Sequence, residues 1–205
     1  MSDIVDITET LDIEKVVAGY RKGVFPMGRE KPGVISWHHP DPRAIMPLDD
    51  GFHISRSLAL VLRQHKYTVT YDQAFLQVMK ACAHRPGVWI TPEFYNIYGQ
   101  LHSQGQAHSV EIWVDGELAG GTYGVHLGAA FFAESKFHRR ANMSKVAVAE
   151  LVFRLRERGF RLLEVQYLTE HLTQFGVIEI PDREYQKRLR LALRQQCSFP
   201  LPTPC

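Results

Sequence analysis

The stretch HSVEIWVDGELAGGTYGV, residues 108–125, is the clearest guide to the fold of this chain. Apolar and polar residues alternate from His108 to Val114, and Asp115-Gly116 is typical of a tight hairpin turn. Residues 117–125 continue as the returning strand, and 129–137 as a third antiparallel strand. An antiparallel sheet is therefore expected in the middle of the chain.

Helical patterns lie on both sides of this sheet. Thr91 suits a helix N-cap, with Pro92 at the first helical position and Glu93 in the first turn. The expected helices cover residues 13–22, 55–65, 73–83, 92–104, 142–157 and 181–196, and further strands cover 67–71 and 162–168. Helices combined with a mostly antiparallel sheet predict an α+β fold.

The first 50 residues differ from the rest. They contain two short apolar runs, Val34–Trp37 and Ala44–Leu48, next to a loop rich in glycine and proline. So short a segment does not supply a core of its own. We expect a small N-terminal lobe over residues 1–50, packed on a main domain over 51–205.

The composition excludes several classes of protein. With 205 residues, 45% of them hydrophobic, the chain has enough apolar material for a core and is not disordered. Apolar runs such as Leu58–Leu62 are far shorter than the roughly 20 residues that cross a bilayer. The acidic N-terminus lacks the features of a secretory signal, so we expect a cytoplasmic protein that does not bind a membrane.

Cysteine and histidine spacing indicates no metal site. Cys82, Cys197 and Cys205 are widely spaced and form no C-x-x-C pair, and the ten histidines show no ligand spacing. We expect reduced thiols, no metal and no cofactor.

Charge is unevenly distributed along the chain. Residues 1–134 hold 11 basic and 15 acidic side chains, a balance of −4, and residues 135–205 hold 13 and 7, a balance of +6. The basic part would suit a polyanion, although solvated helix faces produce the same excess. A protein that coats nucleic acid would be far more basic.

Two stretches carry polar residues that a hydrophobic sheet does not need. Glu134 lies among aromatic residues in FFAESKF (131–137), and a buried carboxylate must be hydrogen-bonded, paired or shifted in pKa. Glu164 and Gln166 are two apart on an expected strand, so both should point to one face. Each fits either a satisfied core residue or a catalytic group, and together they favour function.

Several ordered motifs carry a resemblance to a known family. They include YRKGVFPM (20–27), ISWHHPDPR (35–43), WIT (89–91), FFAESKF (131–137) and VQYLTEHLTQFG (165–176). With them the chain resembles leucyl/phenylalanyl-tRNA–protein transferases from about residue 11 to the final helix. The resemblance implies a GNAT-like C-terminal domain and a small N-terminal domain. It also implies transfer of Leu or Phe, and less well Met, from aminoacyl-tRNA to proteins that begin with Arg or Lys, which then enter N-degron degradation.

The reaction implied by this resemblance needs little chemical assistance. An aminoacyl ester is already activated, and an α-amine with a pKa of about 7.7–8.0 is partly neutral in the cell. By resemblance, Gln166 accepts a hydrogen bond from that amine, Glu164 orients and polarises Gln166, and Glu134 holds the reacting end of the substrates.

The resemblance also directs attention to three sets of binding residues. The apolar aminoacyl pocket is expected at Phe131, Phe132, Leu151 and Leu155, with Thr122 at its rim. The 3′-adenosine of tRNA is expected to stack on Tyr20, Trp37, Trp89 or Tyr98. The tRNA phosphates are expected at Arg56, Arg63, Lys66, Arg139, Arg140 and Lys145.

The chain departs from the family pattern at three positions. Glu164 stands where Asp is usual, Met27 replaces a Trp of some members, and His38 stands where a second aromatic residue is common. A non-catalytic tRNA-binding relative is therefore one alternative. An acyl-CoA-dependent GNAT enzyme is another, but HRRANMSK (138–145) lacks the glycine-rich turn that would hold a pyrophosphate. We expect a monomeric enzyme.

Overall fold

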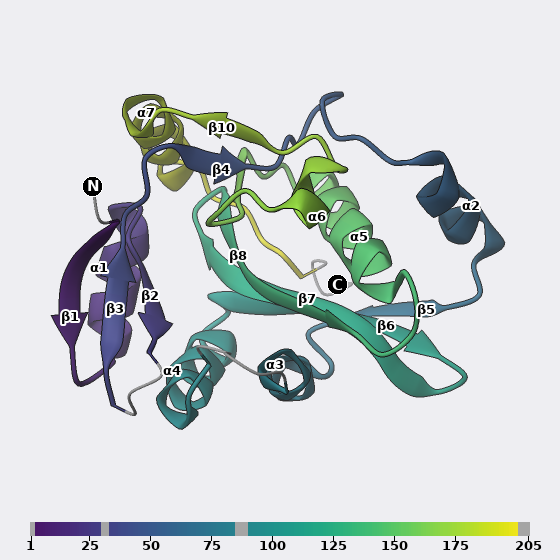
Figure 1. The fold of residues 1–205 in the computed structure, drawn as a ribbon, viewed down its shortest axis with the longest axis horizontal. Helices are drawn as coiled ribbons and strands as arrows, with labels where there is room; N and C mark the ends of the chain where they lie inside the picture. The colour runs from purple at the N-terminus through teal and green to yellow at the C-terminus, as the bar shows by residue number, and fades with distance from the viewer. Residues whose placement is uncertain (1–2, 30–32, 85–89, 201–205) are drawn as a thin grey trace.

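A twisted seven-stranded sheet forms the centre of the molecule (Figure 1). The computed structural model describes residues 3–29, 33–84 and 90–200. The strand order is β10-β4-β9-β8-β7-β6-β5. The bounds are β4 (Arg43–Ile45), β5 (Thr68–Tyr71), β6 (Ala107–Val114), β7 (Glu117–Leu127), β8 (Ala130–His138), β9 (Leu162–Glu164) and β10 (Ile178–Ile180). Neighbouring strands are antiparallel except for the parallel pair β8–β9.

The β6–β7 hairpin has the geometry expected from its sequence. Asp115 and Gly116 both have positive φ, 54° and 78°, as a two-residue hairpin turn of the primed type requires. The predicted third strand follows as β8, paired along β7. The α+β fold class is therefore confirmed.

Strands β8 and β9 separate soon after they meet. Their pairing extends from Ala130 opposite Leu162 to Phe132 opposite Glu164, where β9 ends while β8 continues to His138. The edge of β8 beyond Phe132 therefore has no strand paired on that side within the described residues. This splay allows side chains from both faces of the sheet to meet.

Helices cover both faces of the sheet (Figure 1). On one face lie α3 (Phe75–Ala83) and α4 (Pro92–Ser103), and on the other lie α5 (Met143–Glu157) and α6 (Glu170–Thr173). A separate hydrophobic core fills each face. Gly120 allows α5 to approach closely, because a Cβ at that position would lie 2.6 Å from Cβ of Met143.

A smaller sheet stands beside the large one. It has the order β1-β3-β2, from β1 (Ile4–Thr8), β2 (Phe25–Gly28) and β3 (Ile35–His38), and α1 (Ile13–Arg21) packs next to β2. The remaining helices are α2 (Arg56–Gln64) and α7 (Asp182–Leu193). Strand β4 comes from the first 50 residues but pairs in the large sheet, and the division at residue 50 stays a prediction.

The predicted helices are present, with ends that differ by up to three residues. The predicted strand over 162–168 is wrong beyond Glu164, because Gln166 has a φ of 66°, in the left-handed region. Glu164 is already the last residue that pairs with β4 or β8. Glu164 and Gln166 therefore do not share one face of a strand, and that expectation is also wrong.

Candidate active site

A buried carboxylate lies at the splay between β8 and β9. Glu134 is 6% exposed, and its Oε1 accepts a hydrogen bond of 2.5 Å from the Tyr20 hydroxyl. The hydroxyls of Tyr20 and Tyr98 are 2.6 Å apart, and Gln166 Nε2 donates to Oε2 of Glu134 at 3.1 Å. Residues from α1, α4, β8 and the segment after β9 thus meet at one acid group.

The environment of Glu134 favours its neutral form. Burial raises the pKa of Glu134 to about 8, although the hydrogen bonds from Tyr20 and Gln166 act in the opposite direction. The charge of Glu164 adds to the rise. A group with a pKa close to cellular pH is suited to hold and release a proton.

The backbone of Gln166 directs its amide to this site. A positive φ is costly for a residue with a Cβ, and such conformations persist where the surrounding structure enforces them. The side chain is 9% exposed. Since Nε2 of Gln166 donates to Glu134, its Oε1 is the atom that can accept a hydrogen bond from a substrate amine.

Glu164 belongs to a different cluster. Its Oε1 accepts from the Arg43 guanidinium at 2.5 Å, and its Oε2 accepts from the Tyr185 hydroxyl at 2.9 Å. Arg43 is fully buried, lies 4.0 Å over the Tyr185 ring and donates to the carbonyl of Gly23 at 2.6 Å. Glu164 therefore joins β9 to β4, to α7 and to the loop after α1.

The two charges of this cluster support each other. Burial raises the pKa of Glu164, and the Arg43 guanidinium opposes that rise. Burial also acts against the charge on Arg43, but Glu164, Tyr185 and Asp182 together outweigh it and leave the pKa of Arg43 above its ordinary value. The pair is an ionic anchor in the core.

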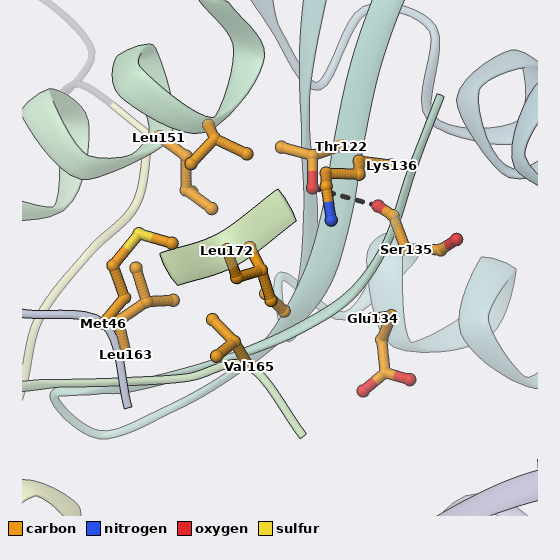
Figure 2. A pocket seen from close by; sticks show the side chains of 11 residues that line it. Met46, Thr122, Glu134, Ser135, Lys136, Leu151, Leu163, Val165 and Leu172 are labelled. Carbon is orange, nitrogen blue, oxygen red and sulfur yellow. Dashed lines mark hydrogen bonds between the residues drawn. The ribbon is translucent and has the colours of Figure 1, made fainter. Parts of the chain in front are cut away.

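An apolar cavity adjoins Glu134 on the α5 face of the sheet (Figure 2). Its lining residues are Met46, Thr122, Ala133, Glu134, Ser135, Lys136, Val148, Leu151, Leu163, Val165 and Leu172. In Figure 2, Glu134 lies at the edge of the group of lining side chains, with its carboxylate directed away from Leu151. The arrangement offers an apolar side chain a cavity that ends beside a polar, proton-binding group.

The sequence comparisons agree with this arrangement. A family model described as "Leucyl/phenylalanyl-tRNA protein transferase" matches residues 45–190, and a model of its N-terminal domain matches residues 9–41. The chain belongs to the leucyl/phenylalanyl-tRNA–protein transferase family. It is accordingly an aminoacyltransferase.

Relatives named leucyl/phenylalanyl-tRNA–protein transferase match most of the chain. The protein from Salinibacter ruber is 49% identical over 185 residues, which are 90% of this chain and 81% of the relative. The protein from Gloeobacter violaceus is 49% identical over 190 residues, 93% of this chain and 98% of the relative.

Among solved structures, FemX has a TM-score of 0.52 and 13% identity, and the match covers 70% of this chain and 60% of that chain. At this identity the likeness shows the fold alone. The fold of this transferase is GNAT-like, as expected.

The structure brings only part of the expected aminoacyl pocket to the cavity. Thr122 and Leu151 line it, whereas Phe131, Phe132 and Leu155 do not. Phe131 and Phe132 are neighbours on β8 and point to opposite faces, so one packs near Phe199 and the other on Tyr20. Leu155 is fully buried in the core under α5.

Several cavity residues of the transferase were missed from the sequence. Val148 precedes Leu151 by three residues and therefore shares its helix face, a signal that was available. Leu163 and Val165 flank Glu164, and alternation along β9 places Leu163 opposite to Glu164. Met46 and Leu172 come from distant segments and carried no signal.

The described residues that are expected to stack on adenosine lie in two places. Tyr20 and Tyr98 are buried beside Glu134, and Tyr20 packs on the Phe132 ring. Trp37 is 2% exposed in the small sheet, where its indole donates to Thr8 Oγ1 at 3.0 Å. Trp89 lies outside the described residues. Adenosine stacking stays a prediction.

The basic residues expected at tRNA phosphates are spread over the surface of the transferase. Five of them are exposed, namely Arg56, Arg63, Lys66, Arg139 and Arg140, and Lys145 is half-buried. Lys66 and Arg140 line one surface pocket, although Arg140 also pairs with Asp115 at 2.7 Å. Arg139 lines a second pocket with Lys80 and Lys136.

Residues 3–29, 33–84 and 90–200 show neither a metal cluster nor a membrane-spanning helix. Within these ranges no group of three or more His, Cys, Asp or Glu side chains is placed to hold a metal ion. In the same part of the chain no helix has the length and apolar character to cross a membrane.

Proposed function

We propose that this enzyme transfers Leu or Phe, and less well Met, from aminoacyl-tRNA to the N-terminal α-amine of proteins that begin with Arg or Lys. One observation carries the proposal: the apolar cavity ends at Glu134, which Gln166 contacts at 3.1 Å. An aminoacyl group with its side chain in the cavity has its ester carbonyl beside these two residues.

The chemistry follows from this placement. The acceptor α-amine attacks the ester carbonyl carbon, a C–N bond forms, the C–O bond to the terminal ribose breaks, and one amine proton passes to the leaving oxygen. Gln166 Oε1 accepts a hydrogen bond from the amine and orients it. Glu134, with a pKa of about 8, holds or relays the proton.

Glu164 takes the role of a positioning residue in this proposal. Its carboxylate is occupied by Arg43 and Tyr185, so it fixes the segment that leads to Gln166. This cluster uses the longer glutamate side chain in place of the aspartate usual in the family. Neither Glu164 nor neutral Glu134 offers a free negative charge, so the preference for Arg or Lys acceptors rests on the family resemblance.

The size of the cavity favours leucine among the donors. It encloses about 60 Å³. This volume is small, so the shorter leucyl side chain requires less movement of the lining than a phenyl ring does. A phenyl ring requires the lining to move. Apolar pockets discriminate weakly, so some transfer of Met is expected as well.

The proposed substrates indicate where in the cell the reaction takes place and what happens to its product. We place the reaction in the cytoplasm, where charged tRNA is used, and the tagged product in an N-degron pathway of protein degradation. The proposed chemistry involves residues of a single chain, as a monomer would provide.

The test is transfer of labelled leucine from Leu-tRNA to peptides that differ only in the first residue: Arg, Lys, Asp, Glu or Ala. We expect transfer to Arg and Lys alone, and Gln166→Ala should remain folded and lose most activity. Transfer to other N-termini would overturn the acceptor assignment. Binding of tRNA with no transfer would identify a binding-only relative.

A matched variant tests the donor assignment. Leu151→Ala enlarges the cavity, so the ratio of Phe to Leu transfer should rise about tenfold, the scale of discrimination expected for a few methylene groups. Leu155→Ala removes the same atoms from the same helix without lining the cavity, and should leave the ratio unchanged. Equal shifts in both variants would place the aminoacyl group elsewhere.

A further inference from the structure

A second cavity, of about 480 Å³, opens where α3 and β8 end. Its polar lining consists of basic side chains, Lys80, His84, Lys136, His138 and Arg139, while none of the described residues that line it carries a carboxylate. We call it the basic pocket. Three permanent cations without a lining acid favour an anionic ligand.

The basic pocket shares a lining residue with the apolar cavity beside Glu134, which we call the aminoacyl cavity after its proposed role. Lys136 lines both, so the two cavities lie within the reach of a single side chain. The aminoacyl cavity is on the α5 face, where Val148 and Leu151 line it. The basic pocket is at the last turn of α3, on the other face. Glu134 lies between the two faces, with its hydroxyl partners on α1 and α4.

On one side of the basic pocket, two contacts fix the orientation of the Arg139 guanidinium. The Arg139 guanidinium donates to the Leu118 carbonyl at 3.2 Å and lies 5.7 Å from the centre of the Phe137 ring. Burial lowers the pKa of His171, and the positive charges of Lys136, Lys145 and His138 lower it further, so positive charge gathers around Lys136. An oriented guanidinium among lysines is suited to a phosphate group.

We propose that the basic pocket binds the 5′-phosphate of the terminal nucleotide of the aminoacyl-tRNA donor. This inference rests on the proposed function. With the aminoacyl side chain on the α5 face and the ester beside Glu134, the terminal nucleoside leaves toward α3. Its phosphate, one nucleoside away from the ester, then meets Lys80, Lys136 and Arg139. The pocket positions the ester independently of the rest of the tRNA.

The test compares two small donors that differ by one phosphate, 3′-O-leucyl-adenosine and its 5′-monophosphate, with a peptide that begins with Arg as acceptor. We expect kcat/KM of the wild-type enzyme to be about tenfold higher for the phosphorylated donor. In Lys80→Glu/Arg139→Glu the ratio should fall to about one. In Arg190→Glu, a single charge reversal at an exposed position of α7 that matches Lys80→Glu, the ratio should persist.

Each outcome of this comparison supports or overturns either the phosphate site or the proposed function. A wild-type ratio near one, or a ratio that survives in Lys80→Glu/Arg139→Glu, would overturn the phosphate site. Inactivity with Leu-tRNA as well as with both small donors would overturn the proposed function instead. Because Arg139 also contacts Leu118, the single variant Lys80→Glu supplies the same test if the double variant does not fold. Added inorganic phosphate should inhibit only the reaction of the phosphorylated donor, and equal inhibition of both would contradict the site.

Discussion

Two buried glutamates lie on neighbouring strands, and their hydrogen-bond partners differ in charge. Glu134 on β8 is surrounded by neutral donors, the hydroxyls of Tyr20 and Tyr98 and the amide of Gln166. Glu164 on β9 is paired with a guanidinium, 2.5 Å away. Of the two, only Glu134 lines the apolar cavity. In the proposed function the same residue type thus serves proton transfer in one place and holds segments together in the other.

The difference lies in how each site compensates for desolvation. A carboxylate in the core must gain a cation or become neutral. Arg43 provides the cation for Glu164, and the resulting pair can do little more than hold segments together. Glu134 has no such partner on the described residues around it, so its pKa rises to about 8 and it remains able to exchange a proton.

The largest effect should come from breaking the ionic anchor. Arg43→Met leaves Glu164 buried without its cation, which typically costs about 3–5 kcal/mol of unfolding free energy. Urea denaturation measures the loss. The double variant Arg43→Met/Glu164→Leu should recover most of it, because the uncompensated charge is then gone. A double variant as unstable as the single one would mean that Arg43 acts through other contacts.

A similar change at Glu134 should affect catalysis instead. Glu134→Gln keeps the shape and the hydrogen-bond acceptor but cannot exchange a proton, so kcat should fall about 100-fold while the protein stays folded. Leucine transfer to an Arg-initiated peptide measures the rate, and circular dichroism confirms the fold. Full activity in the folded variant would exclude Glu134 from the proton transfer.

The pH dependence of the unfolding free energy tests the protonation state of Glu134. Glu134 titrates near pH 4.5 in the unfolded chain and near 8 in the folded protein. The stability gained from its neutral form is complete below the lower value and is lost as pH rises through the higher one. Between pH 6 and 8 the wild type should lose about 2 kcal/mol more than Glu134→Gln. Parallel pH profiles of unfolding would show that Glu134 is ionised in the folded state at pH 6.

Breaking an exposed ion pair should change the unfolding free energy least, in contrast to breaking the buried pair of Arg43 and Glu164. Arg140 and Asp115 are 2.7 Å apart, but the side chains are 43% and 77% exposed. Asp115→Asn should change the unfolding free energy by less than about 1 kcal/mol, because solvent screens the pair. Asn also tolerates the positive φ at this turn position. A loss comparable to that of Arg43→Met would contradict the role assigned to burial.

The sequence anticipated features that depend on near neighbours. The 108–125 hairpin and the Thr91-Pro92 helix start follow local rules and are present. Predictions that needed long-range context were less accurate. The alternation after Glu164 resembled a strand, but the chain leaves β8 at this point, although β8 itself continues, and Gln166 turns into the left-handed region.

By itself, the sequence determined the family, the α+β fold and the polar residues Glu134 and Gln166, because motifs and periodicity are local properties of the chain. Only the tertiary structure decided which partners each acid has. Arg43 and Glu164 are 121 residues apart, and five strands and helices contribute to the apolar cavity. The alignment of strands across the sheet decides which buried acid lies beside a cation. The presence or absence of that cation, and no local sequence pattern, then decides whether the cost of desolvating the carboxylate is compensated.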